Sequence, residues 1–251
     1  ASQSCTNKNK MINNEITLNV YEDRFSKKKL STQLLYGDSF KIIKTFKNYL
    51  KIKSLFDGYV GYISKKKFPK KTINTHKVSV LKANLYSKPN KKFKLKKLIS
   101  FCSYVAIIDS KNGFYKFDKY WIKKNALSLV GNKKKLFSNI RLFKNIKYKW
   151  GGNSSTGIDC SALVQIFFKY NNKYCPRDSK DQINYFKNVK ESKKFNKDQL
   201  IFWKGHVAVC LNKQFLIHAY GPKKKVVIMT IKNTIQEIEK NSKLNIIGVK
   251  I

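Results

Sequence analysis

The sequence predicts an α+β protein in which two small all-β units precede a domain that mixes helices and strands. From about residue 15 to 130, short runs of alternating apolar and polar residues are separated by polar turns, as in half-buried strands. After about residue 131, a glycine- and serine-rich loop leads into a stretch with helical spacing, and apolar runs follow it. The change of pattern near residue 131 therefore predicts the main domain boundary.

The β region divides into two units of similar rhythm. The first, residues 15–70, contains Gln33-Leu34-Leu35-Tyr36-Gly37-Asp38 and a turn-and-strand phrase from Asp57 to Ile63. The second, residues 74–130, repeats the short apolar runs and polar turns. Each unit has room for about five or six short strands around a thin core, so we expect both to pack on a larger neighbour.

Two further segments complete the predicted organisation. Residues 1–14 are polar and show no periodicity, so we expect a loose tail there. Residues 131–251 form the mixed domain, which we expect to open with a helix over residues 136–145. Generic β structure, without any particular barrel, stays open as the alternative for the two β units.

The charge of the chain is extreme. Lys and Arg number 54 against 14 Asp and Glu, which gives a formal net charge of +40. Such a charge is typical of partners that are polyanions, such as nucleic acid or an anionic membrane. Lysine dominates and is scattered along the whole chain, whereas dedicated nucleic-acid sites favour arginine in local patches. We therefore favour a general drift of surface positions toward lysine, and expect no specific nucleic-acid partner and a monomer.

The cysteines and the apolar runs narrow the class further. Five cysteines without a CxxC pair argue against a disulfide scaffold and against a zinc ribbon. No apolar run approaches the roughly 20 residues of a membrane helix, and no signal-peptide core is present. The chain begins at alanine, which is compatible with a leader already removed. The compartment stays open between the cytoplasm and the periplasm or cell envelope.

The loop and helix start near residue 160 carry the first reactive group. A glycine- and serine-rich loop runs into Asp159, a good helix N-cap, and Cys160 follows in the first helical turn. Leu163, Val164 and Phe167 continue at helical spacing. Unpaired N–H groups and the helix dipole at this position favour a thiolate. Cys160 is therefore a candidate nucleophile.

A base for this thiol comes from one of three histidines. His206 opens an apolar strand pattern after Gly205, and His218 lies twelve residues later in the next such pattern. Two adjacent antiparallel strands would place the two rings side by side, so that His218 orients His206. His76 lies between the β units, and we expect a structural role for it. Each feature alone has an ordinary structural explanation, but their combination predicts a nucleophile–base–orienter arrangement.

These motifs resemble those of the NlpC/p60 family of bacterial cell-wall cysteine peptidases. The family reads Tyr-x-Trp-Gly-Gly, Gly-x-Asp-Cys-Ser, Gly-His-Val and then a third polar residue, commonly His. The matching positions are Tyr148, Trp150, Gly151, Gly152, Asp159, Cys160, Ser161, His206 and His218. The stretch Pro176-Arg177-Asp178-Ser179 also looks like its dipeptidyl-peptidase VI-like branch, in which two SH3-like domains are typical. The resemblance implies a papain-like catalytic domain behind two SH3-like barrels.

The resemblance also implies the reaction, which is hydrolysis of the γ-D-glutamyl-diamino acid bond in peptidoglycan stem peptides. Cys160 would attack the carbonyl, its own N–H and the Tyr148 hydroxyl would hold the oxyanion, and His206 would protonate the leaving amine. No metal or cofactor is implied. The expected partner is a peptidoglycan-derived peptide of the form L-Ala-γ-D-Glu-diamino acid, with the diamino acid left open.

The implied substrate contacts extend beyond the catalytic groups. Family members recognise a free N-terminal L-alanine through acidic groups, which implies Asp159 here, completed by Asp38 or Asp57 of the first β unit. The other implied substrate-binding residues are Trp150, Ser161, Arg177 and Ser179.

The chain departs from the family pattern in three places, and rival functions stay open. It has Lys197-Asp198-Gln199-Leu200 where Gly-Asp-Leu is common, Ala162 after Cys-Ser, and no Trp near Leu50. The rivals are a wall-binding protein with an inactive peptidase domain, a nucleic-acid binder, and an amidase or acyltransferase on the same thiol fold.

Overall fold

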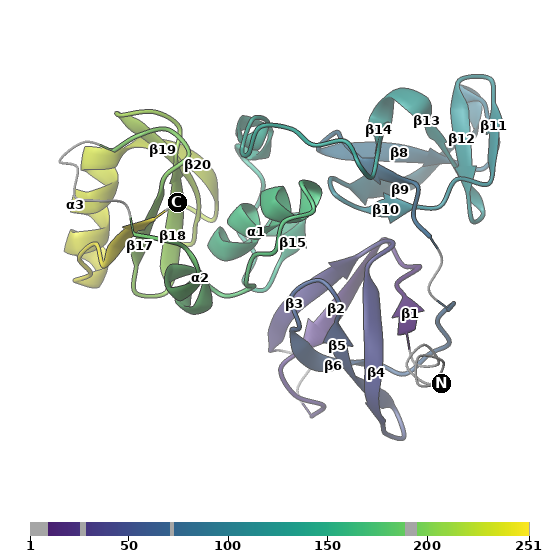
Figure 1. Cartoon of the computed structure of the whole chain (residues 1–251), viewed down its shortest axis with the longest axis horizontal. Coiled ribbons are helices and arrows are strands. Elements are labelled where there is room, and N and C mark those ends of the chain that lie inside the picture. Colours follow the sequence, from purple (N-terminus) through teal and green to yellow (C-terminus); the bar gives the residue numbers. More distant parts are fainter. Residues whose placement is uncertain (1–9, 26–28, 71–72, 189–194, 251) are drawn as a thin grey trace, which may run out of the picture. The chain divides into compact units, whose positions relative to one another are not determined.

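A computed structural model of the 251-residue chain describes residues 10–25, 29–70, 73–188 and 195–250 (Figure 1). The chain divides into two compact units, Ala1–Asn132 and Lys133–Ile251. The first unit consists of β-structure with short 3-10 turns, and the second combines a sheet with three α-helices. The predicted α+β class and the change of texture near residue 131 are thus confirmed.

The first sheet of unit 1 has six strands in the order β1-β4-β5-β6-β2-β3. The strands are β1 (Lys10–Ile12), β2 (Thr17–Tyr21), β3 (Leu30–Leu35), β4 (Ser39–Thr45), β5 (Tyr49–Ser54) and β6 (Val60–Ser64). Successive side chains along a strand alternate between the two faces of the sheet. In β5, Leu50 and Ile52 are therefore buried, while Lys51 and Lys53 point away from the core. Gly61 is required where β6 crosses β2, since a Cβ there would lie 2.5 Å from Val20 Cγ1.

The predicted loose tail is wrong for its last residues. Strand β1 pairs with β4, and the Asn13 side chain that follows is fully buried. Its Nδ2 donates to the carbonyls of Leu34 and Leu35 at 3.1 and 2.9 Å, which ties the chain start to the end of β3. The alternation is too short to be recognised in a three-residue strand. Residues 1–9 lie outside the described part.

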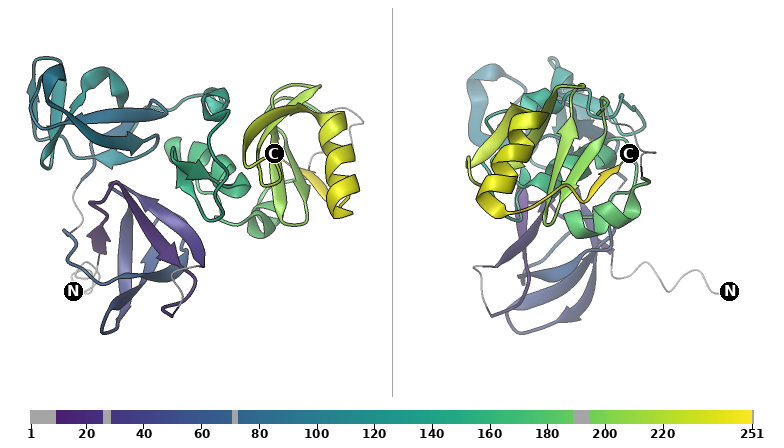
Figure 2. Two further views of the ribbon diagram at one scale, coloured as in Figure 1. Left: turned by 180° about the vertical axis from the view of Figure 1, so that it is seen from behind. Right: turned by 90° about the vertical axis from the view of Figure 1, so that its left-hand side faces the viewer.

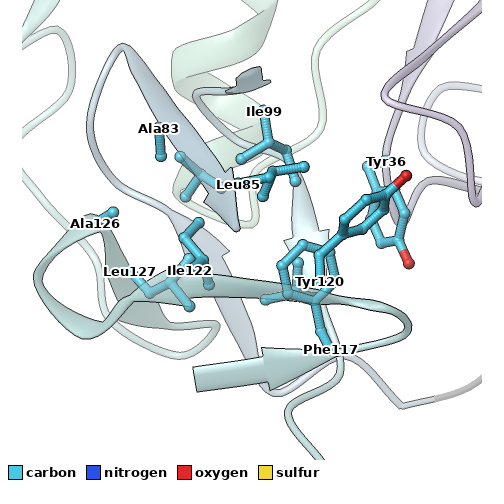
Figure 3. Packing of buried hydrophobic residues seen from close by; sticks show 11 residues of the cluster. Tyr36, Ala83, Leu85, Ile99, Phe117, Tyr120, Ile122, Ala126 and Leu127 are labelled. Carbon is cyan, nitrogen blue, oxygen red and sulfur yellow. The ribbon is translucent and has the colours of Figure 1, made fainter. Parts of the chain in front are cut away.

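The second sheet system of unit 1 surrounds its own apolar core. Its strands are β7 (His76–Val78), β8 (Lys82–Tyr86), β9 (Lys94–Ser100), β10 (Tyr104–Val105), β11 (Asp109–Lys111), β12 (Phe114–Phe117), β13 (Tyr120–Lys123) and β14 (Leu127–Leu129). They form a five-stranded sheet, β11-β12-β13-β8-β9, and a three-stranded one, β10-β7-β14. Figure 3 shows Leu85, Ile99 and Ile122 meeting in this core.

Tyr36, which follows β3, also joins this second core. Its ring packs edge-on against Phe117 with centroids 5.2 Å apart (Figure 3). Its hydroxyl donates to Asp118 at 3.4 Å. Burial and the Asp118 charge raise the pKa of Tyr36. This contact joins the two small β units, and the expectation that each packs on a larger neighbour stays a prediction. The boundaries 15–70 and 74–130, as two SH3-like domains, stay a prediction.

Unit 2 is built on one antiparallel sheet with the order β20-β19-β18-β17-β21. Its strands are β17 (Leu200–Trp203), β18 (His206–Cys210), β19 (Phe215–Tyr220), β20 (Lys225–Thr230) and β21 (Gly248–Lys250). Helices α1 (Cys160–Tyr170) and α3 (Ile231–Ser242) lie on opposite sides of the sheet, and α2 (Ser179–Tyr185) is a short connector (Figures 1 and 2). Helix α3 packs through Ile231 and Ile238.

The helix expected over residues 136–145 is wrong in its length. Only a 3-10 turn, η3 (Ile140–Phe143), forms there. Phe137 and Asn145, at φ 59° and 69°, adopt the left-handed conformation on either side of it. A helix cannot continue through such a residue. No helix in the described ranges combines the length and apolar character needed to cross a membrane.

Candidate active site

The thiol of Cys160 stands at the start of α1, as the sequence predicted. Asp159 caps the helix by accepting a 2.8 Å hydrogen bond from the Ala162 amide. The preceding loop folds back through the short hairpin β15 (Asn153–Ser154) and β16 (Gly157–Ile158). Gly152 permits this fold, because a Cβ there would lie 2.5 Å from the Gly157 carbonyl oxygen. The loop thereby brings its backbone close to the thiol.

The surroundings of Cys160 hold it as a neutral thiol in this structure. Burial, followed by the Asp159 charge, raises its pKa to about 12, although the amides of Val207 and Ser161 hydrogen-bond to the sulfur and oppose the rise. The prediction of a thiolate favoured by the helix start is therefore wrong for the free protein, because burial outweighs the N–H groups. The Val207 bond places the sulfur beside the first residues of β18.

His206 and His218 lie side by side on neighbouring strands, as their spacing predicted. A tight turn at Lys204-Gly205 joins β17 to β18, with Gly205 at φ 75°. Strand β18 then pairs with β19 in antiparallel register, and His206 Nε2 lies 2.8 Å from His218 Nδ1. One ring nitrogen of each histidine is thus committed to the other. His206 Nδ1 remains for a further partner.

Burial keeps both imidazoles neutral. It lowers the pKa of His206 to about 4. The pKa of His218 is lowered by burial, by His206 and by Lys223. Tyr220 stacks on the His218 ring at 4.7 Å with an interplanar angle of 13°. His218 Nε2 is buried and has no hydrogen-bond partner among the described residues.

Tyr148 lies near the thiol, and Trp150 follows it in the loop before α1. Burial raises the pKa of the Tyr148 phenol, and the Cys160 and Asp159 charges raise it further, so the hydroxyl lies near both groups. Trp150 is 72% exposed. An exposed Trp offers an apolar surface to a ligand.

The expected amine-binding role of Asp159 stays a prediction, and in the free chain its carboxylate is engaged within the protein. Its two oxygens accept five hydrogen bonds, from Gly151 N, Ser161 Oγ, Ala162 N and both terminal nitrogens of Arg177. The Arg177 bonds measure 3.0 and 2.6 Å, and both side chains are buried. A carboxylate offers about four lone-pair positions, so no acceptor site is left for an ammonium group.

The hydrogen bonds around Asp159 also include Arg177 and Ser161, two other residues predicted to bind the substrate. Arg177 is only 3% exposed, and its Nη1 also donates to Ser161 Oγ at 3.0 Å. The Ser161 hydroxyl in turn donates to Asp159 at 3.2 Å. Both groups thus hydrogen-bond within the Asp159 cluster in the free chain, and their expected role in binding the substrate stays a prediction. Ser179, half-buried at the start of α2, stays a candidate.

The acids expected from the first barrel have local partners in unit 1. Asp38 is 8% exposed and accepts from the Leu35 amide at 2.9 Å. Asp57 accepts from the Tyr59 amide at 3.0 Å, as in an Asx-turn. Both acids thus stabilise local turns, and their expected part in an amine subsite stays a prediction.

Asp178 is the acid that sequence reasoning missed. It precedes α2 without making a side-chain cap bond and is half-buried. Burial raises its pKa, with Asp159 and Asp181 adding to the effect and Arg177 opposing it. The acid lies close to the Asp159 cluster without being part of its bonds. The signal was available, because Asp178 is the acid of the Pro176–Ser179 motif.

Comparisons with known proteins agree with this arrangement. The NlpC/P60 family model matches residues 145–241, and a model described as the bacterial dipeptidyl-peptidase Sh3 domain matches residues 26–68. A γ-D-glutamyl-L-lysine dipeptidyl-peptidase of Bacillus subtilis is 31% identical over 72% of this chain and 67% of its own length. Dipeptidyl-peptidase 6 of Lysinibacillus sphaericus is 33% identical over 29% of this chain and 27% of its own length.

Solved structures show the same fold. An NlpC/P60 family protein from Bacillus cereus superposes with a TM-score of 0.80 at 20% identity, covering 96% of this chain and 99% of that one. An NlpC/P60 endopeptidase from Photobacterium damselae gives 0.65 at 15% identity, covering 98% of this chain and 72% of that one. The thiol at the start of α1, the paired imidazoles and these matches together show that the chain belongs to the NlpC/P60 family of peptidoglycan peptidases.

Proposed function

We propose that this peptidase uses Cys160 as its nucleophile and cleaves the γ-D-glutamyl-diamino acid bond of stem peptides with a free N-terminal L-alanine. The observation that carries the proposal is the contact between His206 and His218 at 2.8 Å, beside a thiol hydrogen-bonded to Val207. In this proposal Cys160 is the nucleophile, His206 is its base and His218 orients the His206 ring, which are the three roles that thiol catalysis needs.

The hydrogen bond between the imidazoles determines the tautomer that can act as a base. His206 must have an unprotonated Nδ1 to take the Cys160 proton, so its hydrogen lies on Nε2 and is donated to His218 Nδ1. His218 then carries its own hydrogen on Nε2. This assignment makes His218 an acceptor that stabilises the imidazolium formed on His206.

The reaction then proceeds in two stages. The proton of the Cys160 thiol moves to His206 as the sulfur attacks the γ-carbonyl carbon of D-glutamate. The Tyr148 hydroxyl and the Cys160 amide donate to the oxyanion. His206 passes the proton to the leaving amine as the C–N bond breaks, and a thioester remains. Water, deprotonated by His206, hydrolyses the thioester and releases the dipeptide and the thiol.

The proposed cleavage of the γ-D-glutamyl-diamino acid bond is supported by the similarity to a relative. The Bacillus subtilis relative is named for γ-D-glutamyl-L-lysine dipeptides, and an enzyme that removes a dipeptide must recognise a free amine. We assign this recognition to Asp178, because its half-buried carboxyl makes no cap bond while Asp159 is saturated. Ser179 and the exposed Trp150 are the proposed neighbours of the peptide.

Mass spectrometry of the products tests the proposal. L-Ala-γ-D-Glu-L-Lys and the corresponding diaminopimelate peptide are incubated with the full chain and with Cys160→Ala. We expect the dipeptide L-Ala-D-Glu and the free diamino acid from the unmutated enzyme only. Cleavage between alanine and glutamate, or equal product from the Cys160→Ala protein, would refute the assignment. The ratio of the two rates identifies the preferred diamino acid.

A further inference from the structure

The outer face of the first barrel carries lysines that stand directly opposite one another. Across three neighbouring strands, Lys10 pairs with Lys41 and Lys41 with Lys53. A second row pairs Lys44 with Lys51. We name these five residues the lysine face. In the strand ladders of the described residues, every Lys–Lys pair belongs to it; the further pair Lys147–Lys225 is an isolated bridge.

A bulge in β4 gathers the two rows on one face. Ile42 pairs with Ile52, but the register then shifts by one residue, so that Lys44 stands opposite Lys51. Without the extra residue, Ile43 would oppose Lys51 and Lys44 would turn toward the core, because side chains alternate along a strand. The shift therefore places a cation where the simple register would place an apolar side chain.

Such a face is unfavourable by itself. Like charges directly opposite in an antiparallel pair destabilise the sheet. Rows on adjacent strands lie about 4.8 Å apart, and successive outward positions along one strand about 7 Å apart. Neither row contains an acidic residue, since the positions that continue the rows are Val60, Tyr62 and Tyr21. A flat strip of repeated negative charge would relieve this repulsion.

The aromatic rings beside the rows indicate which polyanion fits. Arg24 and Lys44 lie over the Phe46 ring at 4.6 and 5.4 Å, and Lys51 lies over Tyr62 at 5.8 Å. These ring faces are already covered by cations, so they do not serve as open platforms for stacking bases. Lysine ammonium groups act as point charges toward phosphates without reading base edges.

We propose that the lysine face binds a phosphodiester polymer without bases, of the poly(glycerol phosphate) kind. Successive phosphates of an extended chain would lie along the two rows, each replacing the repulsion between opposed ammonium groups by an attraction. The proposal does not depend on the peptidase site, since it concerns only the first barrel. It would hold the enzyme at an anionic matrix while the second unit acts on peptides.

The test uses a fluorescent poly(glycerol phosphate) oligomer and the full-length chain, with binding followed by anisotropy from 50 to 400 mM salt. The variant carries Lys41→Gln, Lys44→Gln, Lys51→Gln and Lys53→Gln. The matched control removes the same charge from exposed lysines around β9 of the second barrel, with Lys91→Gln, Lys92→Gln, Lys94→Gln and Lys96→Gln. Melting temperature and tripeptide hydrolysis verify that both variants are folded.

We expect the lysine-face variant to bind at least tenfold more weakly and the control less than threefold. The slope of log K against log salt should fall by about 3 in the variant, at about 0.7 per lost phosphate contact. Equal losses in both variants would overturn the proposal, because net charge alone would then explain binding. Tighter binding of an oligo-dT of equal phosphate number, lost in the same variant, would overturn the choice of a polymer without bases.

Discussion

Unit 2 contains two polar clusters near Cys160, the Asp159–Arg177 cluster and the His206–His218 pair. They differ in how many of their hydrogen-bonding atoms have a partner. Around Asp159, both carboxylate oxygens and both terminal nitrogens of Arg177 are bonded to one another or to the protein. In the imidazole pair, His218 Nε2 is buried without a hydrogen-bond partner among the described residues, and His206 uses Nε2 in its contact with His218. The first cluster therefore supports the loop, and the second retains the capacity to accept and release a proton.

This difference bears on the role that the sequence suggested for Asp159. In a chain with few acids, the Asp beside the reactive Cys invites a functional role. Its surroundings instead make it the structural centre that joins the Gly151 loop, the α1 start and the Arg177 segment. A functional carboxylate is expected where bonds remain unmade, which singles out Asp178.

The largest effect should come from breaking the imidazole–thiol site. Cys160→Ala and His206→Ala should each lower kcat/KM on the tripeptide by about a thousandfold or more, since removing either group removes covalent catalysis. Steady-state rates measured by product chromatography decide this. Cys210→Ala is the matched control, because Cys210 is another buried thiol on β18 whose pKa is raised to about 12. Near-normal turnover by Cys160→Ala would remove the nucleophile assignment.

The structural cluster should respond in stability instead. Asp159→Asn leaves Arg177 buried beside a neutral amide, and breaking a buried ion pair typically costs about 3–5 kcal/mol. Urea unfolding monitored by fluorescence should show this loss, whereas Asp178→Asn should change the free energy of unfolding by less than about 1 kcal/mol. Equal stability of the two variants would mean that the Asp159 network is not what holds the loop.

The pH dependence of stability separates the two clusters further. The pKa of His206 is about 4 in the folded chain against 6.5 when exposed, so the unfolded state binds more protons between these values. The free energy of unfolding should therefore fall as pH drops from about 6.5 to 4. At about 1.4 kcal/mol per pKa unit, and allowing for the partial exposure of the ring, the loss is about 2 kcal/mol.

Comparison with His206→Ala tests the contribution of the imidazole pair, because His206 also lowers the pKa of His218. Urea unfolding between pH 4 and 8 should give a shallower dependence in the variant. The acid limb of kcat/KM in the unmutated enzyme should likewise lie below pH 6.5, since a neutral His206 is the base. Parallel stability curves for the two proteins would show that His206 titrates normally.

The sequence predicted the parts of the site that depend on local spacing. Cys160 at a helix start and two histidines twelve residues apart on adjacent strands follow from periodicity and a glycine turn. The Asp159–Arg177 pair spans eighteen residues and depends on how the loop before α2 returns to α1. The β4 bulge is likewise decided by pairing partners, so no local pattern indicates it.

The smallest predicted effect tests whether Asp178 recognises the substrate amine. A free N-terminal ammonium would pair with this half-buried carboxylate, whereas an acetylated alanine carries no charge and would leave it unpaired. We expect acetylation to lower kcat/KM of the unmutated enzyme about tenfold, which corresponds to about 1.4 kcal/mol. Asp178→Asn should lower the rate on the free peptide and bring the two rates within about twofold of each other. The exposed neighbour variant Asp181→Asn should keep the full discrimination, because this acid is exposed in the first turn of α2. If Asp178→Asn still distinguishes the two peptides tenfold, the amine is recognised elsewhere. If the unmutated enzyme cleaves both peptides equally, it acts on stems regardless of their amino end.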